Sequence, residues 1–245
     1  MKQAILAVSF GTTYASAEES CIRPVEAALA KANPDCAVRR AYTARIVMRR
    51  LRERGTPVPS VPEALSSLRA EGYSPITIAS THIIPGTEYD MLRKAAEGCP
   101  VSEPLLANDA DLSWMAALMG SIAEAAGTQM LFMGHGTDHA ADAIYVRLRE
   151  KLPEGVFLAC VEGKHHLDAL LPELDALPEK KITVAPLMLV AGDHAHNDLA
   201  GEDDDSWKSI LERRGFTVQV RMRGLGAEEA VRQRFCEKVA KVLQK

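Results

Sequence analysis

The chain has 245 residues, a formal net charge of −4, and a composition that is 47% hydrophobic and 25% charged. A globular protein of this length buries a substantial core, either as one large domain or as two of about 120 residues each. The acidic balance excludes a broad basic surface for nucleic acid, and no stretch approaches the ~20 consecutive apolar residues of a membrane span.

Short apolar runs alternate with longer helical patterns along the whole chain. In the first half we expect strands at 3–10, 37–42, 75–81 and 101–106, and helices at 15–32, 44–54, 61–71, 88–97 and 110–126. The cycle then restarts, with expected strands at 129–134, 156–162, 181–189 and 217–222, and helices at 139–151, 166–177, 203–214 and 227–244. This alternation is typical of βαβ units, so the predicted fold class is α/β, with parallel sheets flanked by helices on both faces.

The restart indicates an internal repeat. The segment LAVSFGT (6–12) aligns with LFMGHGT (131–137), and HIIPGTEY (82–89) aligns with LVAGDHAH (189–196). We therefore expect two similar lobes, residues 1–127 and residues 128–245, with most metal ligands in the second. Ligands of open α/β sheets bind beyond the carboxyl ends of the strands, so the active site is expected in a cleft between the lobes.

Polar side chains gather where the expected strands end. His135, Glu162 and His194 each lie at or just past the carboxyl end of a strand in the second half, and Glu88 has the equivalent position in the first half. His135 stands between two glycines, which permit close approach of another group to the backbone. Structural interpretations stay open, because a Gly-flanked histidine also suits an ordinary turn and Glu162 also suits a helix cap.

The segment GDHAHND (192–198) holds two histidines two residues apart. Gly192 and the polar residues argue against a strand, so both histidines are expected in a turn, where they need not share a metal. His194 is the favoured ligand, because it is nearer the strand end and aligns with Glu88. The acidic run at 202–205 precedes a helix that ends in arginines, which complements the helix dipole and could also attract cations.

Two histidines and one glutamate form an open three-ligand site for a divalent first-row metal. Neutral imidazole and carboxylate bind Co²⁺, Ni²⁺, Fe²⁺ or Zn²⁺, so the ligand types do not select one of these metals. The sequence contains no HExxH motif, no cysteine cluster and no glycine-rich nucleotide-binding pattern, which argues against a nucleotide or phosphate-ester enzyme.

Residues 39–54 hold seven arginines in sixteen positions. Such a segment is typical of a solvated, salt-bridged helix face. Arg39, Arg40 and Arg45 nevertheless flank the carboxyl end of the second expected strand, where guanidinium groups can pair with the carboxylates of an acidic ligand.

With these residues in view, the chain resembles the anaerobic-pathway sirohydrochlorin cobalt chelatases, a family within the class II chelatases. The matching stretches span nearly the whole chain in the expected order, and the last is long and specific. They are VSFGTTY (8–14), RAYT (40–43), HIIPGTEYD (82–90), FMGHGTDH (132–139), VEG (161–163) and PLMLVAGDHAHNDLAGEDDDSWK (186–208).

The resemblance implies two α/β lobes with a tetrapyrrole held between them. It implies insertion of Co²⁺ into sirohydrochlorin, or into its precursor precorrin-2, as an ATP-independent step toward cobalamin with no organic cofactor. By motif matching, His135 corresponds to the family's proton-accepting and metal-binding histidine, and Glu162 and His194 correspond to the other two metal ligands. Glu88 matches an acidic residue of the cleft, whereas His196 lies outside the family's required pattern.

The resemblance also suggests how the substrate is bound and deprotonated. Phe10, Arg40 and the backbone N–H groups around Gly11–Thr12 and Gly136–Thr137 are expected to hold the periphery of the polycarboxylate macrocycle. Metal insertion removes two pyrrole protons, so His135 is expected to take one, and Glu88 to relay or accept the second.

Scattered cysteines and the short apolar N-terminus, MKQAILAVSFGTT, predict a cytoplasmic protein with reduced thiols. Its expected partner is a small tetrapyrrole, with neither nucleic acid nor membrane, and a homo-oligomer is compatible with the sequence. Two alternatives stay open: a nickel or iron chelatase of sirohydrochlorin, and a tetrapyrrole or metal carrier that does no chemistry.

Overall fold

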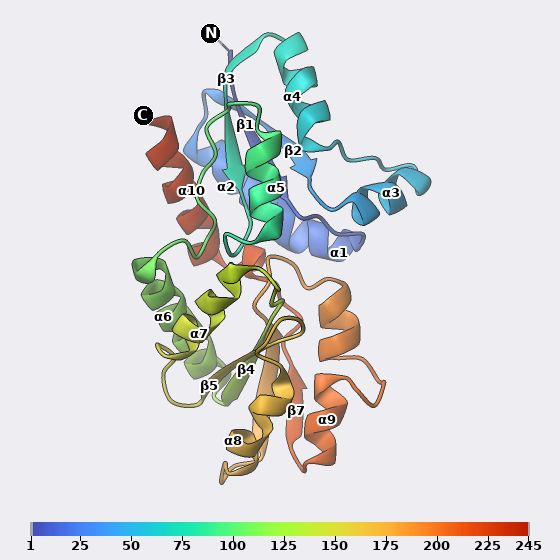
Figure 1. The fold of residues 1–245 in the computed structure, drawn as a ribbon, viewed down its shortest axis with the longest axis vertical. Helices are drawn as coiled ribbons and strands as arrows, with labels where there is room; N and C mark the ends of the chain where they lie inside the picture. Colours follow the sequence, from blue (N-terminus) through green and yellow to red (C-terminus); the bar gives the residue numbers. More distant parts are fainter. Residues whose placement is uncertain (1, 245) are drawn as a thin grey trace. The chain divides into compact units, whose positions relative to one another are not determined.

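The computed structural model describes residues 2–244, and its chain divides into two compact units (Figure 1). The first unit runs to Ala107 and also takes in the residues from Gly226 onward, and the second unit spans Asn108–Leu225. Each unit is a parallel β-sheet flanked by helices, which confirms the predicted α/β class. None of the helices within residues 2–244 combines the length and the apolar character that crossing a membrane requires.

The first unit is built on a parallel sheet of β1 (Lys2–Ser9), β2 (Cys36–Tyr42) and β3 (Tyr73–Ser80) in the order β2-β1-β3. Residues 4–9 of the central strand are all buried, as a strand covered on both faces requires. The expected fourth strand at 101–106 does not form, because only Val101 pairs with this sheet, in an isolated bridge to Ile78.

Helices cover both faces of this sheet (Figure 1). On one face, α4 (Val61–Ala70) and α5 (Thr87–Ala95) pack leucines against alternate residues of β1 and β3. The opposite face is covered by α2 (Arg23–Ala32) and α10 (Glu229–Leu243). The expected helix at 15–32 is interrupted, since α1 (Ala15–Ala17) is followed by the π-helix η1 (Glu18–Ile22) before α2 begins.

The second unit repeats the first three-strand arrangement and extends it. Its sheet contains β4 (Gln129–Gly134), β5 (Val156–Cys160), β6 (Lys181–Pro186) and β7 (Thr217–Val220), all parallel, in the order β5-β4-β6-β7. The order β5-β4-β6 is the order β2-β1-β3 of the first unit, so the internal repeat inferred from the sequence holds at the level of topology.

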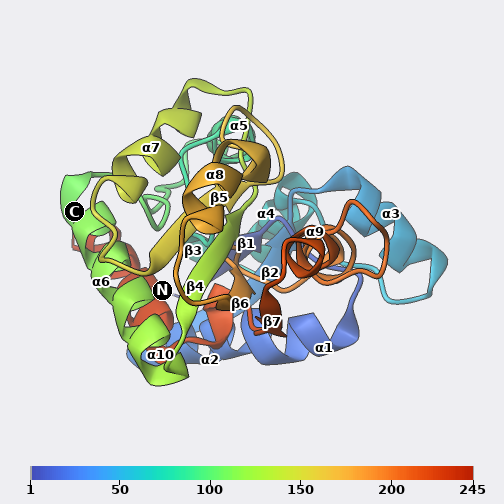
Figure 2. The same cartoon turned by 90° about the horizontal axis from the view of Figure 1, so that it is seen from below.

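Two groups of helices sandwich this second sheet, as seen from below in Figure 2. The helices α6 (Asp109–Ala126) and α7 (Ala143–Arg149) pack on the side of β5. The other face buries one cluster formed with η3 (Leu167–Ala169), α8 (Leu171–Asp175), η4 (Ala195–Leu199) and α9 (Trp207–Arg213). The remaining short elements are α3 (Arg45–Glu53), η2 (Ala140–Asp142) and η5 (Leu225–Ala227).

The compact units depart from the expected boundaries of 1–127 and 128–245. Helix α6 precedes β4 but packs with α7 and β5, and its Asp109 carboxylate pairs with Arg147 at 3.0 Å and with Lys151 at 3.1 Å. Helix α10 closes the chain but packs on α2 and β3, burying Val231 and Phe235. The last helix of each expected half therefore belongs to the other compact unit. The spacing of strands in the sequence does not predict this exchange.

His82 lies just past β3 and is 9% exposed. Its Nδ1 is 3.0 Å from the Ser80 hydroxyl, and its ring meets the Tyr89 ring edge-on at 6.3 Å between centroids. Within the described chain, its Nε2 has no hydrogen-bond partner. Burial disfavours the charged imidazolium and lowers the pKa of His82 to about 4.

The buried imidazole makes stability depend on pH. In the unfolded chain the pKa of His82 returns to about 6.5, so between about pH 6.5 and 4 the unfolded state binds the extra proton. The contribution of His82 is therefore fully present above pH 6.5 and declines on acidification by up to about 1.4 kcal/mol per pH unit. We expect His82→Gln to show a shallower loss of unfolding free energy in urea titrations at pH 7, 6 and 5. An NMR titration showing that folded His82 protonates near pH 6.5 would contradict this prediction.

Candidate metal centre

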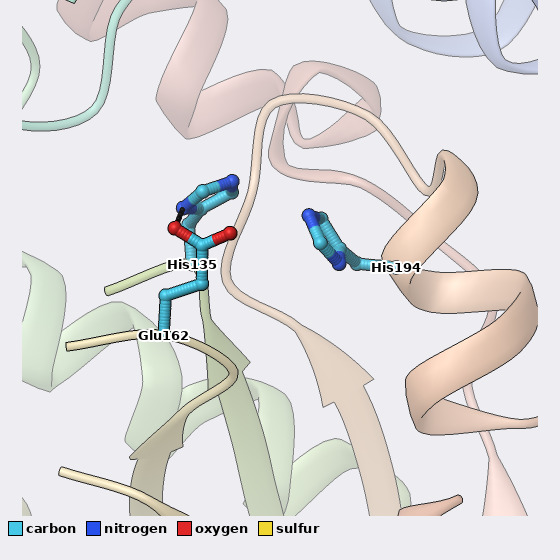
Figure 3. A group of neighbouring side chains, drawn as sticks. All are labelled: His135, Glu162 and His194. Atoms are coloured by element: carbon cyan, nitrogen blue, oxygen red, sulfur yellow. Dashed lines mark ion pairs between the residues drawn. The ribbon is translucent and has the colours of Figure 1, made fainter. Parts of the chain in front are cut away.

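The order β5-β4-β6 brings three chain ends together at the carboxyl edge of the second sheet. His135 follows the central strand β4, Glu162 follows β5 on one side, and His194 follows β6 on the other. One ligand atom from each of these residues lies within 4.8 Å of the others, and they form the group in Figure 3. The structure thus gathers the three residues that the sequence singled out as metal ligands.

The backbone ladder continues past the strands and holds His135 beside Glu162. The Val161 N–H donates to the Gly134 carbonyl at 3.0 Å, and the Glu162 N–H donates to the His135 carbonyl at 2.7 Å. The turn at Glu162 also packs closely against the turn at His135. The Glu162 carbonyl lies so near the Cα of Gly136 that a Cβ there would collide with it. Gly136 also has a φ of 78°, which glycine adopts without strain. The second glycine of the GHG motif is therefore required by the neighbouring turn.

Asp142 braces the same two turns from behind. Asp142 is 7% exposed, and its carboxylate accepts a hydrogen bond from the Thr137 N–H at 3.2 Å and lies 3.4 Å from His165 Nε2. A Cβ on Gly163 would lie 2.7 Å from the same carboxylate, so the glycine of VEG makes room for it. His165 therefore contacts a buried carboxylate and lies outside the group of candidate metal ligands.

In both histidines, Nδ1 is the ring nitrogen with an oxygen acceptor beside it. His135 Nδ1 lies 2.9 Å from the Gly136 carbonyl, and His194 Nδ1 lies 2.8 Å from Asp198 Oδ2. Carbonyl and carboxylate oxygens only accept hydrogen bonds, so each Nδ1 carries the proton. Each Nε2 of the neutral rings then keeps its lone pair for a metal ion.

The three ligands are half-exposed and loosely spaced. The side chains of His135 and Glu162 are 43% and 57% exposed, and His135 Nδ1 lies 3.7 Å from Glu162 Oε2. The rings of His135 and His194 meet edge-on with centroids 4.8 Å apart. Around a bound ion, ligand atoms at about 2.1 Å from the metal sit roughly 3 to 3.5 Å from one another, so only small side-chain rotations are needed. Such a set can hold a divalent ion with coordination positions left open.

The segment that carries His194 is helical, whereas a turn was expected. His194 is the N-cap of η4, a one-turn π-helix whose Ala195 and Leu199 are fully buried. A π-turn places residues four apart on one side, which brings Asp198 under the His194 ring. The acidic run at 202–205 lies in a turn before α9, which begins at Trp207 with Ser206 as its N-cap.

The first unit carries the same turn without the ligands. In both FGT (10–12) and HGT (135–137), the glycine has a positive φ and the threonine hydroxyl accepts from the N–H two residues later, at 3.1 Å in each case. A Cβ on Gly11 would lie 2.5 Å from the Tyr42 ring. Phe10 replaces His135 in this comparison and is 45% exposed.

The remaining predicted residues lie in the first unit. Glu88 is in the first turn of α5, and within residues 2–244 its Oε2 is buried without a hydrogen-bond partner. The Arg40 guanidinium is already engaged, since it pairs with Glu26 through two hydrogen bonds of 2.6 and 2.7 Å and with Glu18 at 2.6 Å. These carboxylates raise the pKa of Arg40. Arg39 pairs with Glu71 at 3.6 Å.

Two supporting carboxylates were not predicted from the sequence, Asp142 and Asp198. Asp198 stands four residues after His194, and that spacing is a signal once the segment is known to be helical. Asp142 gives no such signal, because its neighbours Thr137, Gly163 and His165 come from separate turns.

Two histidines and a glutamate gathered at one sheet edge are the ligand types found in proteins that handle divalent first-row metals. More specifically, the chain belongs to the cobalt chelatase family: residues 3–244 match the family described as Cobalt chelatase (CbiK).

Two relatives are similar over nearly their whole length. The sirohydrochlorin cobaltochelatase of Salmonella typhimurium is 37% identical over 251 residues, covering 96% of this chain and 94% of the relative. The sirohydrochlorin cobaltochelatase CbiKC of Nitratidesulfovibrio vulgaris is 33% identical over 243 residues, covering 93% and 86%. Among solved structures, a glucose-galactose binding protein from Geobacillus stearothermophilus covers 100% of this chain and 91% of its own at 10% identity and a TM-score of 0.44.

The contact between Gly136 and Glu162 leads to a mutational prediction. Gly136→Ala should push the Glu162 turn away from His135 and weaken Co²⁺ binding by at least tenfold in isothermal titration calorimetry. Gly155→Ala is the matched control, because Gly155 has a similar φ of 77° and the added Cβ would meet no atom closer than Gln129 Cγ, at 3.8 Å. Both variants carry a backbone strain of about 1–3 kcal/mol. Equal Co²⁺ affinities in the two variants would show that strain alone matters.

Proposed function

We propose that this protein inserts Co²⁺ into sirohydrochlorin, or into its precursor precorrin-2, in anaerobic cobalamin biosynthesis. The observation that carries the proposal is the convergence of His135, Glu162 and His194 at one sheet edge of a chain that belongs to the cobalt chelatase family. The relatives named for this reaction align with nearly the whole chain.

The reaction exchanges protons for a metal ion. The macrocycle loses two pyrrole N–H protons and gains four nitrogen–metal contacts, with no change of oxidation state. The protein must therefore present the ion with free coordination positions and accept protons close to it. The half-exposed set of two imidazoles and a carboxylate supports both needs, because the macrocycle nitrogens can replace these ligands one at a time. The proposed chemistry requires neither ATP nor an organic cofactor.

His135 is the proposed acceptor of the first proton. Because Nδ1 donates to the Gly136 carbonyl, Nε2 carries the one free lone pair of the ring. Once a macrocycle nitrogen has replaced Nε2 on the metal, this lone pair can accept a pyrrole proton. Glu88 is the proposed acceptor or relay for the second proton. Its unpartnered buried oxygen supports this role, since a carboxylate oxygen without a hydrogen bond can take up a proton.

The proposed substrate contacts lie at the FGT and HGT turns. Exposed Phe10 offers an apolar surface for the face of the macrocycle, while the backbone N–H groups of Gly11 and Thr12 can hold its carboxylates. In the HGT turn the Thr137 N–H already donates to Asp142, so this turn contributes through His135 instead. Arg40 contributes indirectly in this scheme, because its guanidinium is paired with Glu18 and Glu26. We place the reaction in the cytoplasm.

His135→Ala is expected to abolish insertion while leaving the fold intact. The side chain is 43% exposed, so its loss opens no buried cavity. The assay follows the absorbance spectrum of sirohydrochlorin with Co²⁺ and purified protein, and circular dichroism checks the fold. His166→Ala is the control, because this exposed histidine lies at the N-cap of η3 and not in the metal group. Turnover near wild type in His135→Ala would refute the assignment.

Glu88→Gln should separate proton transfer from metal binding. The amide keeps the shape of the side chain but cannot accept the proton, so we expect insertion to slow by about 10²–10⁴-fold, the usual contribution of a general base. Co²⁺ affinity should stay unchanged, because Glu88 is not in the metal group. A parallel loss of Co²⁺ affinity would assign Glu88 a metal-binding role.

The same absorbance assay tests the metal and the alternative functions. Rates with Co²⁺, Ni²⁺ and Fe²⁺ are compared with the uncatalysed rates at equal metal concentration. Faster insertion with Co²⁺ supports the proposal, and a higher rate with Ni²⁺ or Fe²⁺ would make the protein a chelatase for another metal. Tight retention of Co²⁺ or tetrapyrrole without acceleration would favour a carrier.

A further inference from the structure

The geometry points to Asp198 as the residue that positions His194 for metal binding, through a carboxylate–histidine pair in which Asp198 fixes the tautomer and the ring orientation. The inference deepens the proposed function and rests on the same metal centre.

The pair is formed within one turn of helix. His194 is the N-cap of η4 and Asp198 is the fourth residue of that π-helix, and the distance from His194 Nδ1 to Asp198 Oδ2 is 2.8 Å. Leu199 and Ala195 anchor the turn in the core, since both are fully buried. The local fold therefore sets the distance between the two side chains before any metal is bound.

The direction of the hydrogen bond settles which nitrogen is free. The carboxylate only accepts, so Nδ1 donates its proton and Nε2 keeps a lone pair. Neutral histidine without such a partner can carry its proton on either nitrogen, and the Nε2–H form cannot bind a metal through Nε2. A carboxylate behind the ring also makes Nε2 a stronger donor to a cation.

Asp198 has no competing structural task within residues 2–244. Its side chain is 44% exposed, and His194 is its hydrogen-bond and ion-pair partner. A residue at an exposed position normally tolerates substitution with little effect on stability. Its removal therefore changes the metal centre without opening the core.

The three ligands are supported in different ways. His135 is oriented by the carbonyl of the next residue, at 2.9 Å, and Glu162 is held by the backbone bond to His135. His194 differs in that its Nδ1 hydrogen-bonds to a side chain outside the ligand group, whereas the side chain near His135 Nδ1 is the ligand Glu162, at 3.7 Å. Replacing the exposed residue Asp198 should therefore weaken the contribution of His194 to metal affinity without removing any of the three ligands.

The test combines a measurement on the wild-type protein with two variants. Long-range ¹H–¹⁵N NMR of the metal-free protein should show His194 protonated on Nδ1, and this result needs no variant. Asp198→Ala should weaken Co²⁺ binding by about 10–100-fold, the usual effect of losing such a partner. It should also raise the KM for Co²⁺, leave the KM for the tetrapyrrole unchanged and alter the Co²⁺ d–d spectrum.

Asp205→Ala is the matched control, because it removes an exposed carboxylate from the neighbouring acidic run without touching His194. A His194 that is protonated on Nε2 in the wild type would overturn the inference. Co²⁺ affinities within twofold of each other in Asp198→Ala and Asp205→Ala would also overturn it. The tautomer, the Co²⁺ affinity and the d–d spectrum are measured without turnover, so an absence of insertion into sirohydrochlorin would remove the proposed function while leaving the role of Asp198 intact.

Discussion

Parallel pairing of β5, β4 and β6 is the constraint on which the metal centre depends. Parallel strands end at the same edge, and neighbouring strands lie about 4.8 Å apart, so residues that follow three adjacent strands are within reach of one another. The order β5-β4-β6 puts His135 in the middle, with Glu162 and His194 on either side. These residues are far apart in the sequence, and no local interaction would bring them together.

The spacing of the strands alone does not fix the positions of the ligand side chains. Hydrogen bonds and close contacts in the turns after the strands position them further. The turn after β4 and the turn after β5 interlock, because the Glu162 N–H donates to His135 while the Glu162 carbonyl lies against Gly136. Asp142 braces both turns from the buried side. The histidines are then oriented through Nδ1, one by a carbonyl and one by a carboxylate. The site combines a hydrogen-bonded, closely packed backbone with half-exposed side chains, an arrangement suited to holding a metal ion that must be released to a macrocycle.

The two units show how one scaffold serves two purposes. Both have the same three-strand order and the same Gly-Thr turn after the first strand, with matching hydrogen bonds. In the second unit that turn begins with a histidine, and in the first it begins with an exposed phenylalanine. The turn is therefore a repeated structural feature, and the residue before its glycine is a candidate metal ligand in the second unit and an exposed apolar side chain in the first.

Sequence periodicity located the seven strands that form within residues 2–244, because buried parallel strands are short apolar runs and their βαβ alternation leaves few topologies. The same reasoning identified His135, Glu162 and His194, since residues after such strands share one edge. It failed at 101–106, where an apolar run makes only a bridge, and at the unit boundaries, where α6 and α10 pack across the repeat. It also missed the helical turn at His194 and the pairing of Arg40 with two carboxylates. Chain order determined which residues stand at the sheet edge; only tertiary packing decided which side chains there are free, because a partner from a distant turn or helix leaves no trace in local sequence.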